Sequence, residues 1–228
     1  MKPILFIFFS LVIGQPALEK ENIDQPSHFS EKLSVMQLNH SLLNTIVFKL
    51  INAKRQKKGL DTLEYNAALN QVAQNYQNEF ELRRFKNTTS VERKINKNLY
   101  KRTKKAGFDG GLVLPIIAEF DALDYDGKSE YYIDRSKTDS EFKLYYGKKP
   151  RKNELNPYRK PIEPLNYYAF AQKLIKNLES ENRKKLYAKS YKWGGTHLQW
   201  HYKSLNKRKI PQIKMIFLLG GFATAGMR

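Results

Sequence analysis

The chain has 228 residues, of which 41% are hydrophobic and 28% charged, a composition typical of a globular protein and incompatible with a wholly disordered one. Its 41 Lys and Arg residues outnumber 22 Asp and Glu residues, which gives a formal net charge of +19. Because the sequence contains no cysteine, disulfides, thiolate nucleophiles and cysteine-ligated metal centres are excluded.

Residues 1–14 are expected to be a signal peptide. Lys2 precedes the run from Ile4 to Ile13, which only Ser10 interrupts. The run is too short to span a bilayer, which takes about 20 apolar residues, but it is typical of a signal-peptide core with cleavage after Gly14. We therefore expect an exported protein, periplasmic or secreted, with an uncleaved N-terminal anchor as the alternative.

Polar residues 15–37 show little periodicity and predict a linker. From Leu38 onwards apolar residues recur at helical spacing, and Gly59 is the expected end of this first helix. Asn66 stands where the N-cap of a second amphipathic helix belongs.

Two further helices are expected. One follows a capping box at Thr89 and Glu92 and ends at Gly107, with Ile95, Leu99 and Thr103 directed inward. The other covers residues 167–178, where apolar side chains again fall on one face.

The C-terminal part has strand periodicity. Residues 197–202 alternate between apolar and polar, and the apolar run 213–219 predicts a central strand. Residues 203–209 between them predict a basic hairpin loop. Weaker strand signals lie at 113–120, 131–133 and 142–146, and the four prolines of residues 147–164 predict a basic surface loop. Helices followed by antiparallel strands indicate one α+β domain over residues 38–222, with 223–228 as a tail.

Three segments then resemble a known family. They are Asn52-x-x-Arg55-x-x-x-Gly59-Leu60-x-x-Leu63-x-Tyr65-Asn66-x-x-Leu69-x-x-x-Ala73, Arg102-x-x-x-Ala106-Gly107-Phe108 and Ser180-Glu181-Asn182-Arg183-x-x-Leu186-x-x-x-x-Tyr191-x-x-x-Gly195. Their spacing is similar to that of the bacterial SCP-like branch of the CAP superfamily (cysteine-rich secretory proteins, antigen 5 and pathogenesis-related proteins). The resemblance implies a single-domain α-β-α sandwich, with an antiparallel sheet between helices.

The resemblance also implies a cleft with two histidines and two acidic residues that can hold a divalent metal. In this chain the matching positions are occupied by Asn87, Glu119, Asn182 and Trp193. Asparagine is a poor zinc ligand and has no titratable proton near neutral pH. We therefore expect no metal, no cofactor and no catalytic residue. The two asparagines either satisfy backbone groups in a vestigial cleft or line a polar binding site.

The remaining histidines suggest no site. His197 and His201 would face the same way on a strand but lie about 13 Å apart, too far to share one ion. His28 and His40 have no visible partner in the sequence. No nucleophile elbow and no phosphate-binding glycine loop is present either.

Basic clusters give the clearest hint about partners. The candidates for contacting an anionic surface are Lys148, Lys149, Arg151, Lys152, Lys207, Arg208 and Lys209. For an exported chain, anionic lipid, lipopolysaccharide or an acidic glycan fits such a field better than nucleic acid does. A solvated surface with no partner is the alternative.

The first functional hypothesis is an exported, non-enzymatic CAP-like module that binds an extracytoplasmic partner. One alternative is a metal-assisted hydrolase with an atypical cleft around Glu119. The other is a basic protein that binds anionic polymers or membrane surfaces.

Overall fold

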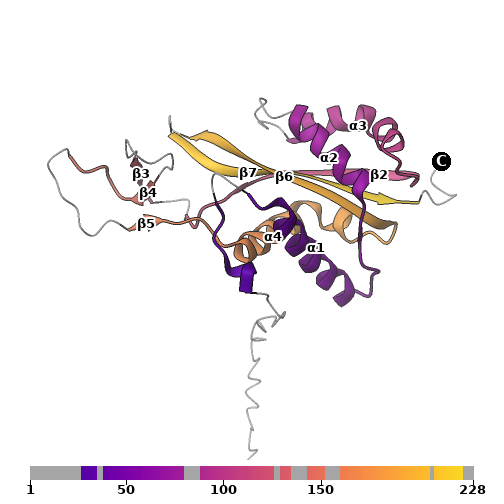
Figure 1. Ribbon diagram of the computed structural model, residues 1–228, viewed down its shortest axis with the longest axis horizontal. Coiled ribbons are helices and arrows are strands. Elements are labelled where there is room, and N and C mark those ends of the chain that lie inside the picture. The colour runs from indigo at the N-terminus through magenta and orange to yellow at the C-terminus, as the bar shows by residue number, and fades with distance from the viewer. Residues whose placement is uncertain are drawn as a thin grey trace, which may run out of the picture.

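Figure 1 shows the computed structural model of the chain, which describes residues 27–34, 38–79, 88–125, 129–134, 143–151, 160–205 and 208–222. The predicted signal peptide, most of the predicted linker and the predicted tail lie outside the described residues, as do Asn87, Lys152 and Lys207.

A four-stranded sheet with the order β1-β6-β7-β2 forms the middle layer. The short β1 (Glu64–Tyr65) runs parallel to β6 (Tyr191–Leu205). The long β7 (Arg208–Gly221) is antiparallel both to β6 and to β2 (Leu112–Asp121). β1 and β2 therefore form the two edges of the sheet.

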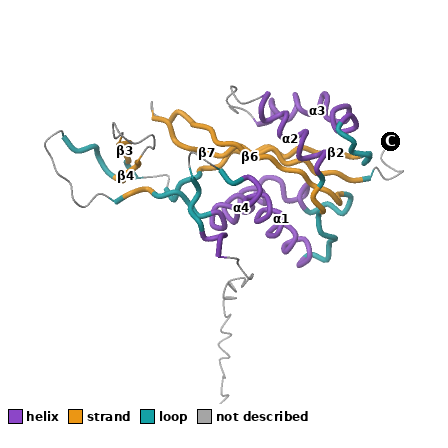
Figure 2. The backbone as a smooth tube through the Cα atoms, viewed as in Figure 1, coloured by secondary structure: helices purple, strands orange, loops and turns teal. Residues whose placement is uncertain are grey.

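Helices cover both faces of this sheet (Figures 1 and 2). α1 (His40–Lys57) and α4 (Tyr167–Leu186) lie on one face, and α2 (Ala67–Glu79) and α3 (Thr88–Lys105) lie on the other. Side chains of β7 alternate between two cores: Met215 and Phe217 are buried with α1 and α4, and Ile216 and Leu218 with α2 and α3. The expected α+β fold, a three-layer α-β-α sandwich, is confirmed.

Local signals for the helices are also confirmed. Asn66 accepts a hydrogen bond at Oδ1 from the Leu69 amide (3.0 Å), as an N-cap does. On α3, Ile95, Leu99 and Thr103 are buried. After α1 the chain turns at Gly59, whose φ of +66° is strained for residues with a side chain.

A second, three-stranded sheet was not expected as a separate unit. It consists of β3 (Tyr131–Asp134), β4 (Lys143–Tyr146) and β5 (Pro161–Ile162), in that order. It has a small core of its own, made of Leu123, Tyr131, Leu144 and Ile162. The predicted surface loop 147–164 therefore needs correction at its end, because Ile162 is a buried strand residue.

Two other predictions differ from the structure. Residues 27–34, expected within a linker, include the 3-10 helix η1 (Ser27–Ser30) and bury Phe29 and Leu33 in the core with α1 and α4. Residues 203–209, expected to be a hairpin loop, mostly continue the ladder of β6 and β7, since Lys203 pairs with Ile210 and Leu205 with Arg208. In both places long-range packing or pairing decides the structure, and the local composition does not show it.

Among the described residues, no helix has the length and apolar character needed to cross a membrane.

Candidate functional site

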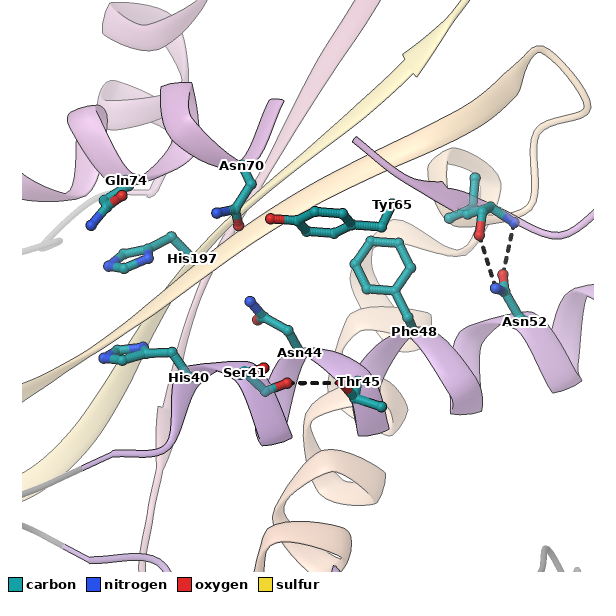
Figure 3. Close-up of a pocket in the computed structure, with 11 residues that line it drawn as sticks. His40, Ser41, Asn44, Thr45, Phe48, Asn52, Tyr65, Asn70, Gln74 and His197 are labelled. Carbon is teal, nitrogen blue, oxygen red and sulfur yellow. Dashed lines mark hydrogen bonds between the residues drawn. The ribbon is translucent and has the colours of Figure 1, made fainter. Parts of the chain in front are cut away.

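A cavity of about 720 Å³ opens at the β1 edge of the sheet, between α1 on one face and α2 on the other (Figure 3). The residues that line it are His40, Ser41, Asn44, Thr45, Phe48, Asn52, Leu63, Tyr65, Asn70, Gln74 and His197. We call this cavity the edge pocket.

Helical spacing gathers its polar residues on two walls. Asn44 and Thr45 follow Ser41 on α1 by three and four positions, so both project from the same face of that helix as Ser41. Asn70 and Gln74 are four positions apart on α2 and face them from the other side of the sheet edge (Figure 3). The local patterns of two separate helices therefore make one polar pocket.

Gly195 of β6 lets α2 come close enough to form the second wall. A Cβ atom at this position would lie 2.2 Å from the backbone nitrogen of Asn70 and 2.5 Å from the carbonyl carbon of Leu69. Any side chain at residue 195 would push the α2 backbone away from the sheet. The position of Asn70 in the edge pocket thus depends on this glycine.

The third wall, the segment that leads into β1, is held by the amide of Asn52. Its Nδ2 donates to the Leu63 carbonyl (2.9 Å), and its Oδ1 accepts from the Leu63 amide (2.8 Å). This pair of bonds fixes the segment that places Tyr65 at the mouth of the pocket, where the Tyr65 and Phe48 rings meet edge to face at 6.0 Å.

Arg55 anchors the same loop from inside the protein. Its guanidinium, which is fully buried, donates to the carbonyls of Asp61 (2.7 Å), Leu186 (2.7 Å) and Tyr191 (3.0 Å). Burial lowers the pKa of Arg55, and the nearby Asp61 carboxylate partly opposes that shift. The Asn52-x-x-Arg55 spacing therefore serves to fix a loop against the end of α4 and the start of β6.

Two histidines stack at one end of the edge pocket. The rings of His40, the first residue of α1, and His197, in β6, lie with their centroids 5.0 Å apart and their planes 10° apart. Burial, with a smaller contribution from His40, lowers the pKa of His197 to about 4. Burial also lowers the pKa of His40, and a hydrogen bond to the backbone of Leu198 partly offsets this. Both rings are therefore neutral near pH 7.

Several polar atoms around the pocket have no hydrogen-bond partner within the described part of the protein. They include Oδ1 of Asn44 and Oδ1 of Asn70. Among the described residues that line the pocket there is no carboxylate and no Lys or Arg side chain. With amide and hydroxyl groups beside two aromatic rings, the pocket can hydrogen-bond an uncharged ligand and pack against it, but it offers little charge to stabilise an ion.

The structure does not bring together the described residues expected in the family's cleft. Glu119 of β2 is in register with Lys214 of β7, and Lys214 is in register with Gln199 of β6. Trp193 lies six residues before Gln199 in β6, which at the rise of a strand is a distance of about 20 Å. Its ring packs edge to face on Phe108. The expectation of a cleft that contains both Glu119 and Trp193 is therefore wrong.

Asn182 comes from a different element than these two residues. It lies in α4, whose buried residues belong to the opposite core, and it interrupts that helix with a φ of −125° and a ψ of 20°. A divalent metal does not fit this arrangement, and the described residues contain no group of three or more His, Asp or Glu side chains that could hold one.

Three of the predicted basic candidates are seen on the surface. Lys148, Lys149 and Arg151 are exposed after β4. Arg208 and Lys209 belong to the paired backbone of β7. Whether these residues contact an anionic partner stays a prediction.

Sequence reasoning missed the edge pocket. It found no partner for His40, and nothing in the sequence shows that His40 meets His197, which is 157 positions away. The asparagines on the polar faces of the first two predicted helices were the available signal for the rest of the lining, but helical periodicity does not reveal that the two faces meet.

A comparison with family models agrees with the resemblance. Residues 48–141 match the model of the cysteine-rich secretory protein family, CAP. No curated protein matches the chain. Among solved structures, an outer surface protein from Borrelia burgdorferi is similar, with 13% sequence identity and a TM-score of 0.42 over 86% of this chain and 99% of that one.

Proposed function

We propose that this chain, whose residues 48–141 match the model of the cysteine-rich secretory protein family, is an exported, non-enzymatic binding module that holds a small uncharged ligand in the edge pocket. The single observation that supports this function is the uncharged lining, in which buried amide oxygens of Asn44 and Asn70 have no partner in the described part of the protein. Unpartnered buried polar atoms are costly and are normally satisfied by a ligand, by water or by protein groups.

The chemistry of the lining indicates the class of ligand. Asn and Gln side chains both donate and accept hydrogen bonds, so they match hydroxyl and amide groups. The rings of Phe48 and Tyr65 provide flat apolar surface beside those amides. A neutral saccharide has both hydroxyl groups and apolar ring faces, and it is the ligand that this combination favours.

Lack of catalysis is part of the proposal. The described lining of the pocket contains two imidazoles but no carboxylate that could orient or charge them, and the low pKa of His197 makes it a weak base. Export rests on the lysine and the apolar run of residues 1–14.

The test is a titration of the protein with neutral oligosaccharides, followed by the side-chain amide signals in ¹⁵N NMR spectra. We expect N-acetylglucosamine oligomers or glucose oligomers to shift the amide signals of Asn44 and Asn70. Asn70→Leu should abolish binding. Asn78→Leu, on the same helix but outside the edge pocket, should leave it intact. If neither oligomer shifts these signals at millimolar concentration, the proposed ligand class is wrong.

A further inference from the structure

The outer face of α3 has an unusual charge pattern. Arg93, Lys94, Lys97, Lys101, Lys104 and Lys105 are all exposed on this one helix. At 100° per residue they fall within an arc of about 120°, opposite the buried Ile95 and Leu99. From Arg93 to Lys105 the stripe is about 18 Å long. We call these six residues the α3 stripe.

Acidic residues in the described part of the chain neutralise little of this charge. The nearest ion pairs of α3 use other residues: Glu92 pairs with Lys185, and Arg102 with Glu79. Among the described residues, Lys104 is the member of the stripe that approaches a carboxylate, that of the exposed Asp109, at 3.5 Å. Like charges three or four positions apart on a helix repel each other. The stripe therefore destabilises its own helix unless an external anion compensates.

From this geometry we infer that the α3 stripe docks the protein on an anionic phospholipid surface. Five of the six cations are lysines, whose compact and strongly hydrated charges suit a diffuse anionic plane better than the two-pronged recognition of single sulfate or phosphate groups. Because the cations point straight away from the core, they can all reach one plane together.

The exposed side chain of Tyr100 favours a lipid surface, and not a soluble polyanion, as the partner of the α3 stripe. Its side chain is 57% exposed and lies at the edge of the arc of the stripe. An aromatic ring with a polar tip is suited to the boundary between headgroups and acyl chains. Among the described residues of α3 no other large apolar side chain is exposed, so the contact is adsorption to the surface without insertion of the helix.

The position of α3 makes this docking compatible with an open edge pocket. α3 packs against β2, which is one edge of the four-stranded sheet, and the edge pocket lies at the opposite edge, beside β1. A protein held on a membrane by the α3 stripe would keep the pocket accessible. Docking does not depend on the ligand proposed above.

The experiment is sedimentation of the protein with phosphatidylcholine vesicles, with or without about one third phosphatidylglycerol, at rising salt. We expect binding only to the anionic vesicles, and binding should weaken as salt rises. The triple variant Lys97→Gln, Lys101→Gln, Lys104→Gln should bind about 100-fold more weakly, at about fivefold for each lysine.

A matched triple variant separates the stripe from net charge. Lys148→Gln, Lys149→Gln, Arg151→Gln removes the same charge from the surface after β4 and should retain most of the binding. Thermal unfolding checks the fold, because the α3 variant loses mainly repulsive pairs and should be at least as stable as the parent. Tyr100→Ser should weaken binding without changing its salt dependence.

Three outcomes would overturn the inference. Both triple variants could lose binding equally, which would assign it to net charge. The variant Lys148→Gln, Lys149→Gln, Arg151→Gln could alone lose binding, which would show that the surface after β4 contacts the membrane. Vesicles could also fail to bind while heparin or duplex DNA binds through Lys97, Lys101 and Lys104, which would make the partner a soluble polyanion.

Discussion

Replacing Arg55 by methionine tests how the edge pocket is supported. Methionine keeps most of the side-chain volume but cannot donate hydrogen bonds. The substitution removes three charged hydrogen bonds of 3.0 Å or less and leaves the carbonyls of Asp61, Leu186 and Tyr191 without this donor. At about 1.5 kcal/mol for each bond, the free energy of unfolding should fall by about 4.5 kcal/mol. That is a large share of the roughly 5–15 kcal/mol that stabilises a typical domain.

Urea unfolding at neutral pH, followed by far-ultraviolet circular dichroism, measures this loss directly. Arg102→Met is the matched control, because Arg102 is partly exposed and pairs with the exposed Glu79. Arg102→Met should lower the free energy of unfolding by about 1 kcal/mol or less. The loss of unfolding free energy in Arg55→Lys should lie between those of Arg55→Met and Arg102→Met, since one ammonium group cannot reach all three carbonyls. If Arg55→Met and Arg102→Met cost the same, the argument that Arg55 anchors the loop fails.

Three further predictions concern the same region. Gly195→Ala should destabilise the protein by about 2–3 kcal/mol in urea unfolding, because its Cβ would meet the Asn70 nitrogen at 2.2 Å. Asn52→Ala should cost about 2 kcal/mol in that assay, since Leu63 loses two hydrogen bonds. The free energy of unfolding should fall as pH drops from about 6.5 to about 4. In this range His197 is protonated in the unfolded chain but stays neutral in the folded protein, where its pKa is about 4. Because His197 is partly exposed, its contribution to this loss of unfolding free energy is at most about 2 kcal/mol. The variant His197→Gln should lack this contribution.

Local structure was the part of the fold that sequence reasoning predicted well. The N-cap at Asn66 and the inward positions of Ile95 and Leu99 follow from rules that involve only a few neighbouring residues. The family resemblance added the layer order, because the spacing around Asn52 and Arg55 is specific.

The roles of those two motif residues were not visible in the sequence. Asn52 binds a residue 11 positions away, and Arg55 reaches carbonyls more than 130 positions away. A one-dimensional pattern shows which residues recur together, but it does not show which backbone atoms they contact. The same limit explains why Phe29 was placed in a linker: one aromatic side chain has no period, yet it finds a buried place in the core.

The sequence by itself determined the composition, the basic character, the helices with their caps and inward faces, and the resemblance to the CAP family, because each depends on residue identity or on contacts a few positions apart. Only the tertiary structure decided that His40 stacks on His197, that Glu119 and Trp193 lie far apart, and that two asparagine-bearing helices enclose one pocket. These features depend on strand register and on which helices cover which face of the sheet, and both are set by the packing of the whole domain.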